Sequence, residues 1–134
     1  MGESRPVLVD TSAWTYYFRY DRRPEPAQRV LAEQVRALVE TGGAWIHPVV
    51  AGEVLLGGVD PYDAFDGLPW LAADSSDRRV LEWLVEVPCD WRRGVGWADS
   101  RIVHSAAVEY AMDLVTGDRD QLAFYQRVLG TGTA

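Results

Sequence analysis

Short apolar runs alternate with longer stretches in which apolar residues recur at helical spacing. Three runs are short and continuous enough to be buried strands: residues 7–9, 44–47 and 112–115. The helical spacing predicts helices over residues 11–20, 27–41, 48–56, 60–67, 78–87, 99–111 and 119–129. This alternation predicts an α/β fold with a central parallel sheet covered by helices on both faces.

The ends of these elements carry the residues that usually start and stop helices. Thr11 or Ser12 is expected to cap the first helix, and Ser75 or Ser76 the helix over 78–87. Residues 21–26 and 68–77 are expected to be loops, 91–97 a turn or short helical piece, and the tail from 130 a frayed end. No repeat or linker divides the 134 residues, so a single domain over residues 1–134 is expected.

The composition is that of a soluble globular protein, and it excludes several kinds of chemistry. All 13 basic residues are arginine. Without lysine, the chain has neither the phosphate-binding lysine of a P-loop nor the amine of a Schiff-base enzyme. Cys89 is the only cysteine, which excludes an intramolecular disulfide and a cysteine-based metal site.

The sequence predicts neither a membrane span nor a secretory signal. The most apolar stretch, residues 44–59, is interrupted by His47, Pro48 and Glu53, so it is too short for a span. The N-terminus lacks the basic and then apolar order of a signal peptide. A cytoplasmic protein without a membrane partner is therefore expected.

Four acidic residues stand out by their positions. Asp10 and Asp118 follow predicted strands, Asp99 opens the helix over 99–111, and Glu53 interrupts the apolar stripe of the helix over 48–56. Taken singly, each has an ordinary structural interpretation, because aspartate is a common helix N-cap and a buried acid usually finds a cationic partner. Asp120 can likewise be a first-turn acid that the helix dipole favours.

Taken together, the acids predict a metal site. Because parallel strands end at one edge of a sheet, Asp10 and Asp118 are expected at the edge where α/β proteins bind ligands. Carboxylates gathered there repel one another unless a cation neutralises them. Hard oxygen ligands select Mg²⁺ or Mn²⁺ over zinc, and such a site suits phosphoryl or phosphodiester chemistry.

Four motifs in order give the chain a family resemblance. They are LVDTSAW (8–14), HPVVAGEVLLG (47–57), VGWADSRIVHSAA (95–107) and LVTGDRD (114–120). Each alone is weak, but their order and approximate spacing resemble PIN-domain ribonucleases, and most closely the VapC toxins of bacterial toxin–antitoxin pairs. The resemblance covers nearly the whole chain and implies a PIN-like three-layer α/β/α domain.

The resemblance implies roles for the acids and for the protein. Asp10, Glu53, Asp99 and Asp118 would be the catalytic, metal-binding carboxylates, and Asp120 lies where some members keep a further acid near the metals. Thr11, Ser12 and Thr116 flank them and are expected to orient a carboxylate or a water. The implied activity is Mg²⁺- or Mn²⁺-dependent endonucleolytic cleavage of single-stranded or loop RNA, leaving a 5′-phosphate and a 3′-hydroxyl. The implied partners are a cognate antitoxin protein and a second copy of the chain in a homodimer.

The chain departs from the family pattern near its C-terminus. Members often have an aromatic residue soon after the last acidic pair, whereas here residues 121–123 precede Phe124. The final strand common in the family is not recognisable in residues 127–134. Both departures concern the C-terminal architecture and leave the four acids unaffected.

An RNA-binding surface must be local, because the net charge is −7. The candidate contacts are arginine clusters and exposed aromatic residues, although most such residues serve packing or a solvated face. The candidates are Arg19, Arg22, Arg23, Arg92, Arg93 and Arg119, with Trp14, Tyr17 and Trp91 for stacking. His47 and His104 are predicted to be structural, since neither repeats at metal-ligand spacing.

Three other functions compete with the toxin ribonuclease. The chain could be a non-toxin PIN nuclease in RNA processing, although its small size disfavours this. It could be a catalytically inactive PIN-like binding module, although all four acids are present. A Mg²⁺-dependent phosphatase is disfavoured because Asp10 is followed by Thr-Ser-Ala instead of the pattern DxDxT.

Overall fold

The computed structural model describes residues 5–20 and 25–130 of the chain, and in these residues three strands form one parallel sheet. The strands are β1 (Val7–Val9), β2 (Ala44–Trp45) and β3 (Asp113–Val115). β1 lies in the middle, with Val7 paired to Ala44 of β2 and to Asp113 of β3. All three predicted strands are present, although β2 and β3 are shorter than expected.

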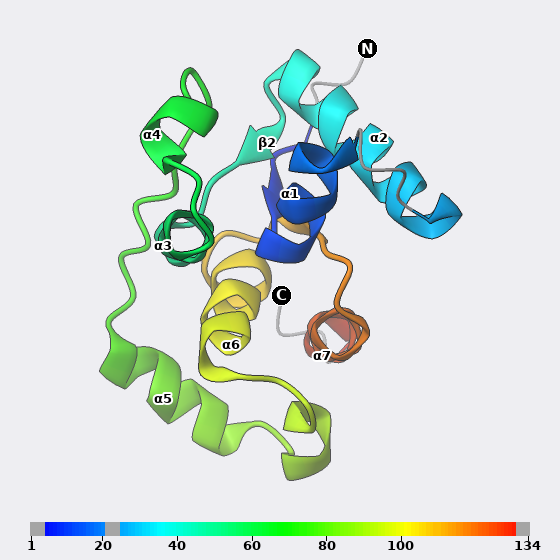
Figure 1. Cartoon of the computed structure of the whole chain (residues 1–134). Helices are drawn as coiled ribbons and strands as arrows, with labels where there is room; N and C mark the ends of the chain where they lie inside the picture. Colours follow the sequence, from blue (N-terminus) through cyan, green and yellow to red (C-terminus); the bar gives the residue numbers. More distant parts are fainter. Residues whose placement is uncertain (1–4, 21–24, 131–134) are drawn as a thin grey trace.

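Helices surround this sheet (Figure 1). They are α1 (Thr11–Phe18), α2 (Pro26–Thr41), α3 (Pro48–Leu56), α4 (Pro61–Ala64), α5 (Asp77–Glu86), α6 (Trp97–Val103) and α7 (Arg119–Gly130), with a 3-10 turn η2 (Cys89–Arg92) and a π-helical segment η3 (His104–Glu109). The sequence prediction is confirmed at the level of a mixed α/β fold with a parallel sheet. Gly130, expected in the frayed tail, is the last residue of α7. The rest of that tail and most of the loop over 21–26 lie outside the described residues, so they stay predictions.

The helix predicted over 99–111 differs from the expectation at both ends. It begins at Trp97, because Gly96 is extended and serves as the N-cap without a side-chain acceptor. From His104 onward the turns widen, and the Tyr110 N–H bonds to the Ser105 carbonyl, five residues back. Residues 104–107 are buried, and Asp99 lies in the first turn of α6, two residues after its start at Trp97.

The cap of the first helix is also different from the prediction. Neither Thr11 nor Ser12 is the N-cap; the cap is Asp10, whose backbone is extended and whose carboxylate accepts the Ser12 N–H. An aspartate satisfies the free N–H groups of a first turn as well as a serine does, so β1 and α1 need no intervening loop. For α5 the prediction is confirmed, since Ser76 accepts the Arg79 N–H.

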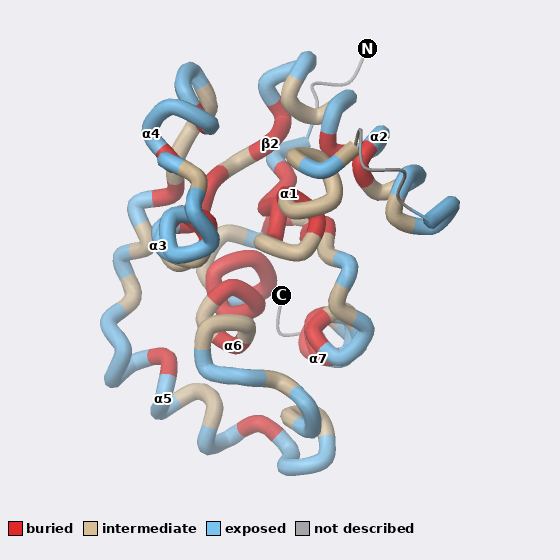
Figure 2. The backbone as a smooth tube through the Cα atoms, in the orientation of Figure 1, coloured by how far each residue is buried: buried red, intermediate tan, exposed pale blue. Residues whose placement is uncertain are grey.

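The core lies between the sheet and the helices that cover it (Figure 2). β1 is buried along its whole length, and Ile102 of α6 and Phe124 of α7, which belong to the same core cluster, are fully buried. Trp14 is only 1% exposed and packs on Phe18 and Phe65, with ring centroids 5.8 and 4.7 Å away. The expectation that Trp14 stacks on RNA is therefore wrong, because its ring belongs to the core.

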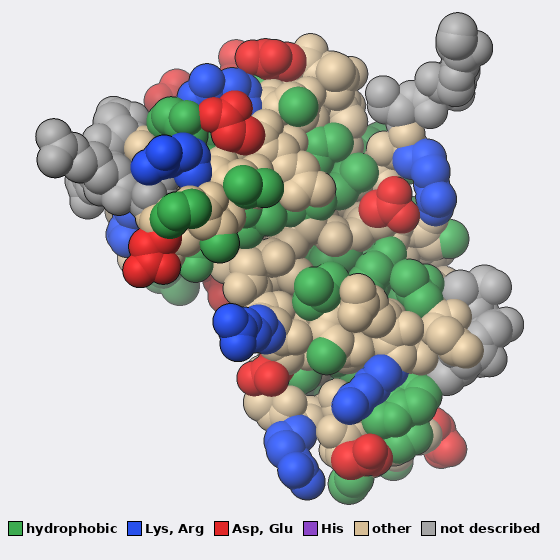
Figure 3. All heavy atoms as spheres, turned by 90° about the vertical axis from the view of Figure 1, so that its right-hand side faces the viewer, with side chains coloured by type: hydrophobic (Ala, Val, Ile, Leu, Met, Phe, Trp, Pro, Cys, Tyr) green, Lys and Arg blue, Asp and Glu red, His purple; other side chains and the backbone are tan. Residues whose placement is uncertain are grey.

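In the described part of the chain, no helix is both long and apolar enough to cross a membrane. The face shown in Figure 3 carries acidic and basic side chains interspersed among uncharged ones. No continuous patch of positive or of negative charge covers that face, so the electrostatic potential at each point depends on the nearest charged side chains.

Candidate active site at the carboxyl edge of the sheet

Asp10 lies at the end of the central strand and is held from both of its oxygens. Its side chain is almost wholly buried, at 3% exposed. Oδ2 accepts from the backbone N–H and the hydroxyl of Ser12, at 3.2 and 3.0 Å, and Oδ1 accepts from Nε2 of Gln121 at 3.3 Å. The Thr116 hydroxyl lies 3.2 Å from Oδ2 as well. Donors from three segments, at Ser12, Thr116 and Gln121, thus fix the orientation of the Asp10 carboxylate.

Asp118 begins the helix that follows β3. Its Oδ1 accepts the N–H groups of Asp120 and Gln121, at 2.9 and 3.0 Å, so the carboxylate caps α7. Of the described residues, none bonds to its Oδ2. The capping role and a ligand role do not exclude each other, because each uses a different oxygen.

Glu53 reaches the site from the middle of α3. Its Oε1 accepts the Thr11 hydroxyl at 2.6 Å, and the residue is half-buried. The bond joins α3 to the first residue of α1, directly after Asp10. The acid that interrupts the apolar stripe of α3 is thereby drawn to the end of β1.

The pKa of Asp99 reflects its burial and the charges of the other three acids. Burial, together with the negative charges of Asp10, Asp118 and Glu53, raises its pKa to about 6. A hydrogen bond with the Gly96 backbone acts in the opposite direction. Asp99 and the acids predicted to accompany it therefore repel one another electrostatically, although they come from four separate segments of the chain.

The donors around Asp99 fit a hard divalent cation by their chemistry. Carboxylates and hydroxyls supply only oxygen, which suits Mg²⁺ or Mn²⁺, and a cation would relieve the repulsion that raises the pKa of Asp99. In the described residues, no three His, Cys, Asp or Glu side chains already form a ready-made metal-binding group.

Asp120 lies apart from these four acids. Its carboxylate packs on Gly94, a residue with φ of +79°, so closely that a Cβ at position 94 would collide with it. The side chain borders a neighbouring hollow, together with Arg93 and Arg127. The groups that shift the pKa of Asp99 are Asp10, Asp118 and Glu53, while Asp120 faces the loop before α6.

The sequence analysis missed Gln121, which links the two sides of the site. It is fully buried, donates to Asp10, and accepts the Thr116 hydroxyl at 2.7 Å. The Ser12 hydroxyl completes the network, since it accepts the Gly117 N–H at 2.8 Å. A signal was present, because Asp followed three residues later by Gln is the pattern of a capping box.

Both histidines have structural surroundings. Nδ1 of His47 accepts the Val49 N–H and caps α3, and Nε2 lies 3.0 Å from the Ser105 hydroxyl. Burial, helped by the charge of Arg101, lowers the pKa of His47 to about 4, so the ring is neutral at pH 7. The ring of His104 packs edge-on against Trp83, and burial lowers its pKa as well.

The arginine and aromatic candidates for RNA contact differ in how far their side chains are exposed. Arg19, Arg93 and Arg119 are exposed, whereas Arg92 is half-buried and donates to the Cys89 sulfur at 3.0 Å. Tyr17 and Trp91 are half-buried at the rim of the core. The predicted contacts at Arg22 and Arg23 lie outside the described residues.

Neutralising Asp118 is expected to weaken Mn²⁺ binding, whereas neutralising Asp120 is not. Asp118→Asn keeps an oxygen that can cap α7 but removes the charge, so we expect affinity to fall about tenfold or more, with little change in stability. Asp120→Asn should leave affinity within about twofold, since its carboxylate lies on Gly94. Titration calorimetry with Mn²⁺ measures both, and equal decreases in affinity would place Asp120 among the ligands.

No model of a known protein family matches the chain, and no curated protein matches its sequence.

Proposed function

We propose that the chain is a metal-dependent endoribonuclease of the PIN type, with Asp10, Glu53, Asp99 and Asp118 as its metal-binding carboxylates. One observation carries the proposal: Thr11, next to Asp10, bonds to Glu53, and Gln121 bonds to both Asp10 and Asp118, while burial and the charges of these three acids raise the pKa of Asp99. Four acids from distant segments converge at a ligand-binding edge only at a cost in free energy, and a site for cations explains that cost.

The residues of the proposed site have different roles. Bound Mg²⁺ or Mn²⁺ would supply an activated water and stabilise charge on the phosphate. Gln121 and Ser12 hold Asp10 so that its direction is set before an ion arrives. Asp118 keeps Oδ2 available while Oδ1 holds α7. Asp99 must lose its proton to act as a ligand, so protons compete with the metal ion, and metal affinity is expected to rise with pH through about 6.

The toxin role, the cognate antitoxin, the homodimer and the PIN-like three-layer architecture are further parts of this proposal. They rest on the resemblance of the four motifs. A protein partner is supported by exposed apolar side chains at the end of α3 and on α4: Leu55, Leu56, which is 89% exposed, and Tyr62. Cytoplasmic localisation, expected from the sequence, is likewise part of this proposal.

An RNA cleavage assay with the purified chain tests the proposal. We expect single-stranded RNA to be cut in Mg²⁺ or Mn²⁺, with 5′-phosphate and 3′-hydroxyl products, and EDTA to abolish the reaction. Asp10→Asn should do the same, and Asp66→Asn, an exposed acid in the turn after α4, is the matched control. Activity that survives both EDTA and Asp10→Asn would refute the metal-carboxylate mechanism.

The inactive binding module predicts a different outcome of the same assay. It would bind RNA or protein without cutting RNA under any metal condition. Induced expression in a bacterial host adds a test of the toxin role, since growth should stop with the unchanged chain and continue with Asp99→Asn. Mapping the new RNA ends in those cells would identify the RNA that is cut.

A further inference from the structure

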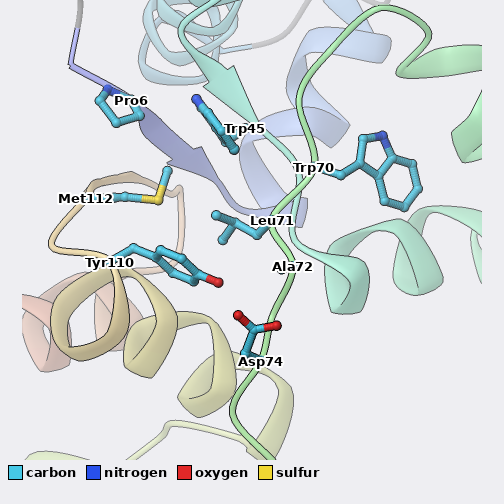
Figure 4. Close-up of a pocket in the computed structure, with 8 residues that line it drawn as sticks. All are labelled: Pro6, Trp45, Trp70, Leu71, Ala72, Asp74, Tyr110 and Met112. Carbon is cyan, nitrogen blue, oxygen red and sulfur yellow. The ribbon is translucent and has the colours of Figure 1, made fainter.

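A polar hollow of about 290 Å³ lies beside the carboxylates, between α7 and the segment that leads into α6. Its lining residues are Asp90, Trp91, Arg93, Asp120, Ala123 and Arg127. A second hollow, of about 430 Å³, is lined mainly by apolar residues such as Trp45, Leu71 and Met112 (Figure 4), and it lies near the opposite ends of the strands. Only the first is built by the segments that carry the acids.

The segments that line the polar hollow adjoin two acids of the candidate active site along the chain. The segment on one side contains Gly94 and leads within five residues to Asp99. The helix on the other side begins immediately after Asp118, and its Asp120 carboxylate packs on Gly94. The two walls of the hollow are therefore joined to each other by Asp120 and lead directly to Asp99 and Asp118.

Two guanidinium groups in the hollow are available to bind an anion. Arg93 and Arg127 are both exposed. Among the described residues, ion pairs with acids are formed by Arg5, Arg78 and Arg101, and by neither arginine of the hollow. An arginine fork matches the geometry of a phosphate oxygen pair. Asp90 and Asp120 offset the two positive charges. An anion must therefore be recognised by direct hydrogen bonds from the two guanidinium groups, and not by a net positive charge of the hollow.

Trp91 gives the hollow an aromatic wall. It is half-buried, and it packs against the core while it also lines the hollow. A tryptophan anchored in this way stacks on an unpaired base, and the interaction tolerates any base because each has a π face. Bases already stacked within a duplex cannot use such a wall.

We propose that this hollow binds one nucleotide of single-stranded RNA next to the phosphate that is cut, with Trp91 stacking on the base and Arg93 and Arg127 holding a phosphate. The volume suits a single nucleotide unit, since it lies at the lower end of the range for small-ligand pockets. The proposal extends the proposed nuclease function and rests on it for the identity of the substrate.

The test measures RNA binding without cleavage. A fluorescently labelled single-stranded hexaribonucleotide is titrated with the full chain in EDTA, and its anisotropy is recorded at several salt concentrations. We expect the double variant Arg93→Ala/Arg127→Ala to bind about tenfold or more weakly. The slope of log affinity against log salt should decrease by about 0.7 for each phosphate that the variant no longer neutralises. Trp91→Leu should weaken binding about tenfold, while Trp91→Phe retains most of it.

The matched control is Arg78→Ala, which removes an exposed arginine that is paired with Glu82 on α5. It should bind like the unchanged chain, and a duplex of the same sequence should fail to compete. Thermal melting of every variant verifies the fold. Undetectable binding by the unchanged chain, unchanged affinity in the double variant, or effective competition by the duplex would each overturn the proposal.

A parallel cleavage assay in Mg²⁺ separates this proposal from the nuclease proposal. If the unchanged chain binds RNA through Arg93 and Arg127 but never cuts it, the nucleotide pocket holds and the nuclease fails. If the double variant cuts RNA with an unchanged KM, the nuclease holds and the pocket is wrong. The two failures therefore give different results.

Discussion

Asp99→Asn is expected to abolish Mg²⁺-dependent RNA cleavage and, in the metal-free protein, to raise the melting temperature at pH 8. The loss of activity should be on the order of a hundredfold or more, because the variant removes a charged ligand of the proposed ion. The gain in stability should follow because the variant also removes the carboxyl that burial and three neighbouring acids disfavour in its charged form.

The pH dependence of this gain follows from the pKa. The folded protein raises the pKa of Asp99 from 3.8 to about 6, so it binds the proton more tightly than the unfolded chain does. The free energy of unfolding contributed by Asp99 therefore falls as pH rises from 3.8 to about 6, and the full cost remains above that range. The advantage of Asp99→Asn should be complete at pH 8 and absent near pH 4.

Calorimetry with and without Mg²⁺ gives the decisive comparison. Mg²⁺ should raise the melting temperature of the unchanged protein more than that of Asp99→Asn, since an ion that binds only the folded state stabilises it. Asp66→Asn, an exposed acid away from the site, should behave like the unchanged protein. An Asp99→Asn variant that melts lower at pH 8 in EDTA would contradict the clustering of the four charges.

Gln121→Leu is expected to destabilise the fold and to impair cleavage together. The leucine fills a similar volume, but it removes the donor to Asp10 and the acceptor of the Thr116 hydroxyl. A buried polar group without its partner costs about 1–3 kcal/mol of the free energy of unfolding. A carboxylate without its supporting donor typically costs about 10- to 100-fold in metal affinity or activity. Urea unfolding and the RNA cleavage assay measure the two effects.

Gln126→Leu is the matched control, because Gln126 is exposed on the same helix. It should change neither quantity appreciably, as expected for an ordinary surface substitution. A Gln121→Leu variant with full stability and full activity would show that Asp10 keeps its orientation without the amide, and it would reduce Gln121 to a packing residue.

Much of the fold could be predicted because it depends on local patterns. Buried apolar runs marked the strands, and helical spacing marked α2, α3, α5 and α7. The strand order and the π-helical turns after Val103 were not predictable, because both depend on interactions between distant segments. Trp14 was misplaced on the surface for the same reason, since Phe65, which buries it, lies far along the chain.

The acids of the candidate site could be predicted from the sequence, but the residues that hold these acids in place could not. Asp10 and Asp118 follow strands, and the rule for parallel sheets brings strand ends together without any knowledge of the side chains. That rule cannot show which acids stay at the edge, and Asp120 turns toward Gly94. Nor does it show that Gln121 is buried, because glutamine is usually exposed and its burial depends on Asp10 and Thr116.

The position of β3 in the sheet has a consequence for self-association. β1 pairs with both other strands, so, among the described residues, β3 has a strand partner on one side only, and on the other side its row of backbone groups pairs with no strand. Such a row can pair with the same row of another molecule and start aggregation. Here the row is three residues long and begins with a charged residue, Asp113, which lies 3.5 Å from Arg5. A short, charged edge is a common natural protection against aggregation, and it would keep the protein dispersed at high concentration.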